Sequence, residues 1–163
     1  MTIEEKKLLV RDIIGRIPYG VIVRHNNSGV AGVLHDISVY PKYDGNDICD
    51  YLCSIMFFGD ESISVEYFKP ILRPVSDMTK EEIEHICKIC YFGNPADDYD
   101  KHDHRGVEIV SYIYKSMQEP HTDVTLDFDE VAEITDYLNS RHIDYRGLIE
   151  KGLAIKSESN EYF

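Results

Sequence analysis

The chain has no tryptophan, and its apolar runs are short. A helix that crosses a bilayer needs roughly 18 or more consecutive apolar residues, and no run here approaches that length. The first residues carry Glu4 and Glu5 ahead of any apolar run, which is not the pattern of a secretory signal. A hydrophobic content of 43% over 163 residues is nevertheless sufficient for a packed core. We therefore expect a soluble, cytoplasmic protein that has no membrane partner.

Basic residues are also scarce: 17 Lys and Arg stand against 30 Asp and Glu, which gives a net charge of −13. Because nucleic-acid binding depends on clustered cations, this balance argues against direct nucleic-acid binding. No Lys or Arg lies between Lys115 and Arg141. The acidic residues of that stretch are Glu119, Asp123, Asp127, Asp129, Glu130, Glu133 and Asp136. The stretch is interpreted either as a solvated helix face or as a contact surface for a basic partner.

The four cysteines do not form a zinc motif of the usual kind. Cys87 and Cys90 share a helical stripe with neighbouring isoleucines, where a free cysteine serves as a small apolar residue. Cys49 and Cys53 fall in an apolar run that resembles a strand rather than a tight metal-binding turn. We predict reduced, metal-free thiols and no cofactor.

Local patterns predict an α+β fold that begins with a helix. Thr2 and Glu5 form a capping-box pattern at its start, and Gly15 and Pro18 end it. Strand-like runs separated by short turns follow, at residues 21–23, 30–40, 48–58 and 63–67. They predict a small antiparallel sheet of four to five strands, either curled or closed as an SH3-like barrel, since closure removes exposed edges.

The pattern changes to helices in the second half of the chain. Thr79 and Glu82 repeat the capping-box pattern and open a helix that runs to about Tyr91. A further helix follows Asp127, and Gly152 precedes a short final strand. We therefore divide the chain into residues 1–75, a helix with a small sheet or barrel, and residues 76–163, a helical half. The two parts are expected to share one core.

One polar loop combines carboxylates with imidazoles, the ligands that divalent cations and transition metals prefer. Its candidate ligands are Asp97, Asp98, Asp100, His102 and His104. The spacing does not match the twelve-residue calcium loop, and a solvated loop is the other interpretation. A metal site here would indicate a metal-dependent enzyme. No nucleophile elbow or phosphate-binding glycine loop accompanies it, so the sequence favours a protein that is not an enzyme.

Tyrosine is abundant, with 12 residues. Aromatic residues gather in the strand half at Tyr40, Tyr43, Tyr51, Tyr67 and Phe68. An aromatic-lined surface of this kind binds peptides or bases. The alternative is that the tyrosines rim a small sheet with their rings in the core and their hydroxyls in water.

Residues 68–79 (FKPILRPVSDMT) and 144–149 (DYRGLI) form a pair of motifs. Together they resemble a family of small uncharacterised phage and prophage proteins of gut bacteria, whose pattern is KPxLRPxSxMT followed by DYRGLI and GLA. Residues 17–21 are also similar to that family, whereas residues 88–125 have no counterpart. The resemblance implies a phage or prophage accessory protein and carries no activity.

The second motif allows two roles for Asp144, Tyr145 and Arg146. In the first, Arg146 binds an anion and Asp144 orients it. In the second, Asp144 caps a turn and Arg146 braces the structure. Taken together, the sequence predicts an accessory protein that binds a host component without catalysis, through its acidic stretch. A basic or nucleic-acid-binding host protein fits that surface. The alternatives are a small-molecule or peptide binder built on the tyrosine-rich half and a metal-dependent enzyme.

Overall fold

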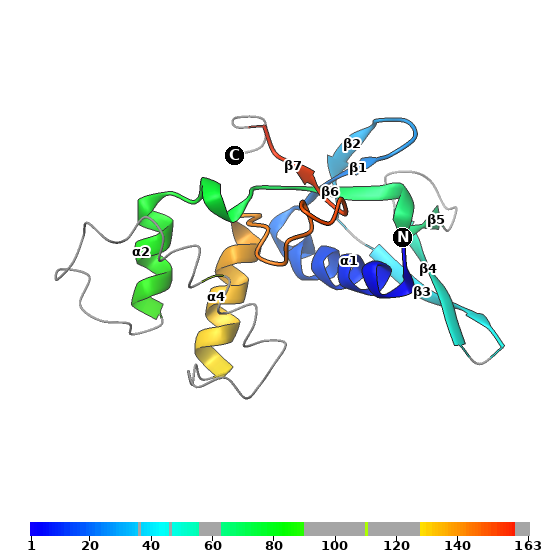
Figure 1. Cartoon of the computed structure of the whole chain (residues 1–163), viewed down its shortest axis with the longest axis horizontal. Helices are drawn as coiled ribbons and strands as arrows, with labels where there is room; N and C mark the ends of the chain where they lie inside the picture. The colour runs from blue at the N-terminus through cyan, green and yellow to red at the C-terminus, as the bar shows by residue number, and fades with distance from the viewer. Residues whose placement is uncertain (36, 46, 56–62, 90–109, 111–127, 159–163) are drawn as a thin grey trace. The chain divides into compact units, whose positions relative to one another are not determined.

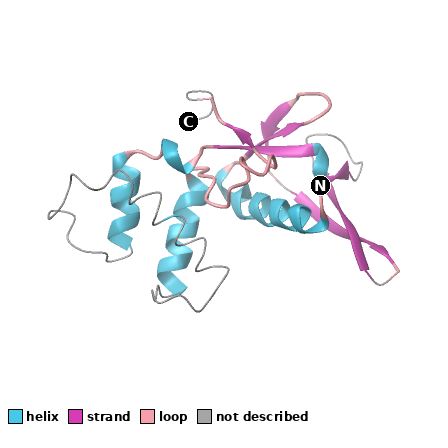
Figure 2. Cartoon of the chain, viewed as in Figure 1, coloured by secondary structure: helices cyan, strands magenta, loops and turns pink. Residues whose placement is uncertain are grey.

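A computed structural model describes residues 1–35, 37–45, 47–55, 63–89, 110 and 128–158 (Figure 1). The chain divides into two compact units, one made of Met1–Leu72 with Leu148–Phe163 and the other of Arg73–Gly147. Among the described residues, the strands and the N-terminal helix belong to the first unit, and helices α2 and α4 belong to the second (Figure 2). The α+β class predicted from the sequence is confirmed. The sequence-based division fell after residue 75 and assigned residues 148–163 to the helical half.

Helix α1 spans Ile3–Arg16 and begins with the predicted capping box. The Thr2 hydroxyl accepts a hydrogen bond from the Glu5 N–H at 3.2 Å, and the Glu5 carboxylate accepts one from the Thr2 N–H at 2.6 Å. A 3-10 turn over Ile17–Tyr19 follows and ends at Gly20, whose φ is 70°. A left-handed conformation costs other residues about 1–2 kcal/mol, so glycine suits this position.

The larger sheet is four-stranded, in the order β2-β1-β6-β7. Its strands are β1 (Ile22–His25), β2 (Ala31–Val33), β6 (Phe68–Leu72) and β7 (Ile155–Lys156). β1 is antiparallel to β2 and to β6, and β6 is parallel to β7. Strand β6 lies inside this sheet although it contains Pro70, which lacks an N–H. The pairing with β7 starts only at Ile71, so Pro70 interrupts no pair on that side.

The smaller sheet is three-stranded and antiparallel, in the order β3-β4-β5. Its strands are β3 (Ile37–Asp44), β4 (Asp47–Ile55) and β5 (Ile63–Ser64). Residues 30–40, predicted as one strand, are divided between β2 of one sheet and β3 of the other. Residues 65–67, also predicted as strand, form a 3-10 turn. The described strands therefore form two open sheets rather than one closed SH3-like barrel.

The core of the first unit lies between α1 and the sheet residues. It contains Leu9, Val10 and Ile13 of α1 together with Val21, Val23, Leu34, Val65 and Phe68. Two charged residues of α1, Asp12 and Arg16, are fully buried as well. Arg16 donates to the Asp12 carboxylate from Nε at 2.8 Å and from Nη2 at 2.9 Å. Such a pair costs desolvation free energy, which the two charge-assisted hydrogen bonds offset.

The second unit contains helix α2 (Lys80–Ile89) and helix α4 (Phe128–Ser140). Apolar side chains of both helices pack with the segment that follows α4. The buried members of this core are Ile86, Ile89, Val110, Ile134, Leu138, Ile143 and Tyr145. The helical periodicity predicts one apolar face made of Phe128, Val131, Ile134 and Leu138. Ile134 and Leu138 are fully buried, whereas Val131 is half-buried and Phe128 is 94% exposed, so only the later part of that face lies in the core.

A Schellman motif ends α4. The Ile143 N–H donates to the Leu138 carbonyl at 3.0 Å, and the His142 N–H donates to the Asn139 carbonyl at 3.1 Å. His142 takes the left-handed position with φ 53°, which is usually held by glycine. Ile143 and Leu138 are both fully buried in the same core, which is the apolar contact that accompanies this motif. The motif turns the chain sharply and directs Ile143 back into the core.

The same arrangement recurs ten positions later, in the first unit. The Leu153 N–H donates to the Leu148 carbonyl at 2.8 Å, and the Gly152 N–H donates to the Ile149 carbonyl at 3.0 Å. Gly152 has φ 68°. The predicted stop at Gly152 and the short strand after it are therefore present, with the strand at Ile155–Lys156.

Candidate functional site

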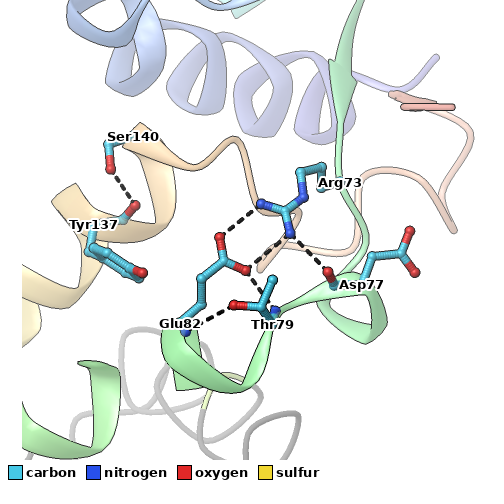
Figure 3. A network of polar contacts seen from close by, with 6 residues as sticks. All are labelled: Arg73, Asp77, Thr79, Glu82, Tyr137 and Ser140. Atoms are coloured by element: carbon cyan, nitrogen blue, oxygen red, sulfur yellow. Dashed lines mark hydrogen bonds and ion pairs between the residues drawn. The ribbon is translucent and has the colours of Figure 1, made fainter. Parts of the chain in front are cut away.

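Arg73 is the centre of a polar network in the second unit (Figure 3). Its backbone forms a parallel β-bridge with Ile143. The Arg73 N–H donates to the His142 carbonyl at 2.9 Å, and the Arg73 carbonyl accepts from the Asp144 N–H at 2.7 Å. The second of these bonds joins the two sequence motifs, because Arg73 belongs to 68–79 and Asp144 to 144–149.

The Arg73 side chain connects this bridge to the start of α2. Its Nη1 and Nη2 atoms donate to Glu82 Oε1 and Oε2 at 2.9 and 3.0 Å, and Nη2 also donates to the Asp77 carbonyl at 2.8 Å. Glu82 completes the predicted capping box, because its Oε2 accepts from the Thr79 N–H at 2.8 Å and its N–H donates to Thr79 Oγ1 at 3.3 Å. One carboxylate therefore fixes both a helix start and an arginine fork.

The electrostatics keep Glu82 ionised. Burial by itself raises the pKa of this carboxyl, but the hydrogen bonds from Arg73 and from the Thr79 backbone lower it, as do the charges of Arg73 and Arg141. The net result is a pKa below the usual value for glutamate. Since both oxygens already accept hydrogen bonds, Glu82 is unsuited to proton transfer, and the network acts as a structural clamp.

The residues of the second motif lie directly after this bridge. Asp144 and Tyr145 are buried, with exposed fractions of 6% and 3%. The Tyr145 hydroxyl donates to Asn139 Oδ1 at 3.3 Å, and the Arg146 guanidinium carbon lies 4.8 Å from the centre of the Tyr145 ring. Tyr145 is part of the second unit's core. These contacts favour the bracing role of the motif.

The predicted acidic surface is described in part. Asp129, Glu133 and Asp136 lie on α4 and are exposed, and Glu130 is half-buried. Glu119, Asp123 and Asp127 lie outside the described residues. At 100° per residue, positions 129, 133 and 136 fall on one side of the helix. Ile134 and Leu138 face the core from the opposite side. Helix α4 contains no Lys or Arg, so this side carries negative charge alone.

Sequence reasoning missed a cluster around Tyr137. The Tyr137 ring lies 4.3 Å from the His85 ring of α2, between centroids, and the Arg141 guanidinium carbon lies 5.7 Å from the Tyr137 centroid. The i, i+4 spacing of Tyr137 in α4 and Arg141, the first residue after the helix, was the available signal. The contact with His85 had none, because it joins two helices far apart in sequence.

The metal-site residues Asp97, Asp98, Asp100, His102 and His104 lie outside the described residues. Within the part of the chain that is described, no group of three or more His, Cys, Asp or Glu side chains is arranged to hold a metal ion. The Cys87 side chain is half-buried and is not part of a disulfide. The side chains of Cys49, Cys53 and Cys90 are not among those described.

The tyrosines of the strand half have different environments. Tyr40 and Tyr43 of β3 are 53% and 57% exposed, and Tyr67 is 39% exposed. Phe68 is fully buried in the first unit's core. The side chain of Tyr51 is outside the described set. Tyr40 and Tyr43 thus lie on β3, an edge strand of the smaller sheet, whereas Tyr67 lies in the 3-10 turn Val65–Tyr67 and stacks with the His25 ring at 6.3 Å between centroids.

Comparisons with protein-family models, with curated proteins and with solved structures give no match for this chain. None of the described helices is both long and apolar enough to cross a membrane.

Proposed function

We propose that this protein is a phage or prophage accessory protein that binds a basic host protein through the exposed acidic side of α4, without catalysis. The observation that carries the proposal is the row of Asp129, Glu133 and Asp136 on one side of a helix that has no basic residue. The phage setting rests on the resemblance of residues 68–79 and 144–149.

The acidic row does not serve the stability of the helix. Like charges at i, i+4 destabilise a helix by about 0.2–0.5 kcal/mol per pair, and Asp129 and Glu133 have this spacing. Asp129 alone gains from its place in the first turn, near the positive end of the helix dipole. A partner surface with Lys or Arg relieves the repulsion along the row and gains Coulomb energy.

An exposed aromatic residue stands at the start of the same helix. Phe128 is 94% exposed. Aromatic side chains are enriched among the residues that dominate binding energy at protein interfaces. Phe128 therefore offers an apolar anchor beside the carboxylates, which provide steering and register.

The spacing of the row favours a host protein that itself binds nucleic acid. At 1.5 Å rise per residue the three carboxylates succeed one another at about 6 and 4.5 Å along the helix. A row of closely spaced negative charges presents cationic side chains with a line of anionic groups, as a phosphate backbone does. The proposed partner surface is thus one built for phosphates.

The test reverses charge on the row and compares partner capture. Immobilised wild type is incubated with an extract of a bacterial host, and the basic protein recovered is then purified and titrated directly. Glu133→Lys and Asp136→Lys should each weaken that binding at least tenfold, and high salt should weaken wild-type binding in the same direction. Glu158→Lys, an exposed residue of the first unit, makes the same charge change and should bind normally.

Glu133→Lys also separates function from folding. It replaces a like-charge i, i+4 pair with an attractive one, so the melting temperature should stay the same or rise slightly while binding is lost. Unchanged binding in both variants, or equal loss in Glu158→Lys, rejects the acidic side of α4 as the contact surface.

A second candidate function is peptide binding on the smaller sheet, favoured by the exposure of Tyr40 and Tyr43 on edge strand β3. An extended peptide would pair with that edge and pack on the rings. Thermal stabilisation by members of a peptide panel, lost in Tyr40→Ala with Tyr43→Ala, is the expected result. No stabilisation by any member removes this candidate.

A further inference from the structure

The larger sheet has a charge balance opposite to that of the whole chain. Strands β1, β2, β6 and β7 contain no Asp or Glu, whereas they contain Arg24, Lys69 and Lys156. The chain as a whole has 30 acidic and 17 basic residues. The strands of this sheet are therefore basic, whereas the chain as a whole is acidic.

Two of these cations are direct cross-strand neighbours. Arg24 of β1 is paired in register with Lys69 of β6. Side chains at such positions start about 4.5–5.5 Å apart at Cβ, and like charges there repel and destabilise the sheet. Within the described part of the chain, neither side chain takes part in an ion pair or a side-chain hydrogen bond. The repulsion is therefore not relieved by a carboxylate of the described structure.

Both cations lie on the face of the sheet away from α1. Val23 and Phe68, at the neighbouring positions of the two strands, are buried in the core with α1. Because side chains alternate along a strand, Arg24 and Lys69 point to the other face, where both are half-buried. Arg24 is also in register with Ala31 of β2, which is too small to cover it.

Apolar residues surround the pair on this face. Alternation places Ile22 and Val33, which are in register with each other, next to Arg24, and Ile71 next to Lys69. Val33 is 37% exposed, and Ile71 is 6% exposed. Charges on a partly desolvated surface attract an anion more strongly than fully solvated charges do.

We propose that Arg24 and Lys69 form a two-pronged binding site for one phosphate-type oxyanion, either free phosphate or a phosphate monoester. The guanidinium supplies a planar fork that donates to two oxygens, and the ammonium supplies a compact charge to a third. Two cations are too few to hold a nucleic-acid backbone, whose binding needs many phosphate contacts. The competing role is that the aliphatic stems of both residues only cover the apolar face of the sheet.

The first experiment titrates the full-length protein with inorganic phosphate at constant ionic strength, with chloride as the reference anion. The expected result is saturable backbone-amide NMR shifts in β1 and β6 and a rise in melting temperature. Arg24→Gln and Lys69→Gln should each weaken binding at least tenfold. Arg11→Gln, which removes the same charge from an exposed position of α1, should bind as wild type does.

A parallel titration with O-phosphoserine distinguishes the two sources of the anion. Tighter binding of the monoester than of inorganic phosphate assigns the site to a phosphorylated ligand whose organic part contacts Ile22 or Val33. Equal or weaker binding assigns it to free phosphate. The proposal is overturned if the shifts do not saturate with either probe. It is also overturned if the Arg24→Gln and Lys69→Gln variants bind phosphate with the same affinity as the wild type.

A second measurement separates binding from a structural role without any ligand. In phosphate-free buffer Lys69→Gln should melt at or above the temperature of the wild type, because the substitution removes the repulsion with Arg24. Melting well below wild type shows that Lys69 stabilises the sheet by itself, and that result also overturns the proposal.

Discussion

Arg73 and Glu82 are joined by two parallel hydrogen bonds, from Nη1 to Oε1 at 2.9 Å and from Nη2 to Oε2 at 3.0 Å. In the sequence, Arg73 precedes the 3-10 turn Val75–Asp77 and Glu82 follows it. The pair holds the chain between the bridge to Ile143 and the first turn of α2. Its removal should therefore loosen the second unit as a whole.

We expect Arg73→Ala to lower the free energy of unfolding by about 3 kcal/mol, because it leaves the Glu82 carboxylate largely buried without its cation. Arg73→Lys should lose less, since it keeps the charge but not the fork. Urea denaturation measures both. Lys88→Ala, which removes an exposed cation of α2, serves as the control and should change stability little. An Arg73→Ala loss no larger than the control's would show that the clamp contributes nothing.

Glu82 also predicts the acid sensitivity of the protein. Its pKa is lower in the folded protein than in the unfolded chain, where the glutamate pKa is about 4.3. The stability it contributes is therefore complete above that value and is lost as the pH falls through the lower folded-state pKa. Unfolding free energies measured along a descending pH series should fall less steeply for Glu82→Gln than for wild type. Superimposable pH profiles would contradict this.

Two core positions should be sensitive to substitution, one in each unit. Leu138 and Val65 are fully buried. Leu138→Ala should cost about 2–5 kcal/mol through the lost contacts and the cavity, and Val65→Asp should cost more because its carboxylate has no partner in the core. Val30→Asp, at a position 46% exposed, should stay within about 0.5 kcal/mol of wild type. Thermal and urea melts check all three, and near-normal melting of either core variant would disprove its assigned face.

Arg146→Ala decides between the two roles of the second motif. If Arg146 braces the fold, the loss of its contact with the Tyr145 ring and of its packing should lower stability by about 1–3 kcal/mol. We expect this outcome, because Asp144 and Tyr145 are buried. A variant that melts normally but fails to bind the host partner, or an anion, would instead make this motif a binding site.

The features that the sequence predicted well are those set by neighbouring residues. Both capping boxes, the burial of Ile134 and Leu138 in α4 and the turn at Gly152 depend on spacings of three to five residues. The same periodicity was wrong for Phe128, which is 94% exposed. Strand β6 was missed because Pro70 disfavours a strand inside a sheet, and only the register with β7 shows why it is tolerated there. Similarly, residues 30–40 alternate like one strand, and their division between two sheets depends on partners distant in sequence.

The Arg73–Glu82 contact and the buried Asp12–Arg16 pair also could not be predicted from short sequence patterns. The capping box gave Glu82 a local role, but its second role depends on Arg73, which reaches it across a turn that no short pattern predicts. Asp12 and Arg16 have the i, i+4 spacing of a surface ion pair. They are buried because they share the inward side of α1 with Leu9 and Ile13, and a charge-based interpretation places such residues in solvent.

The pairing of Leu72 with Lys156 can form only late in the synthesis of the chain. As the chain leaves the ribosome, β6 appears long before its parallel neighbour β7, and every residue of the second unit is made in between. Until β7 arrives, one edge of β6 is open to pairing with another chain. Parallel pairing across so long a loop is slow to close. Nascent chains interrupted before Ile155 should therefore be the aggregation-prone species of this protein.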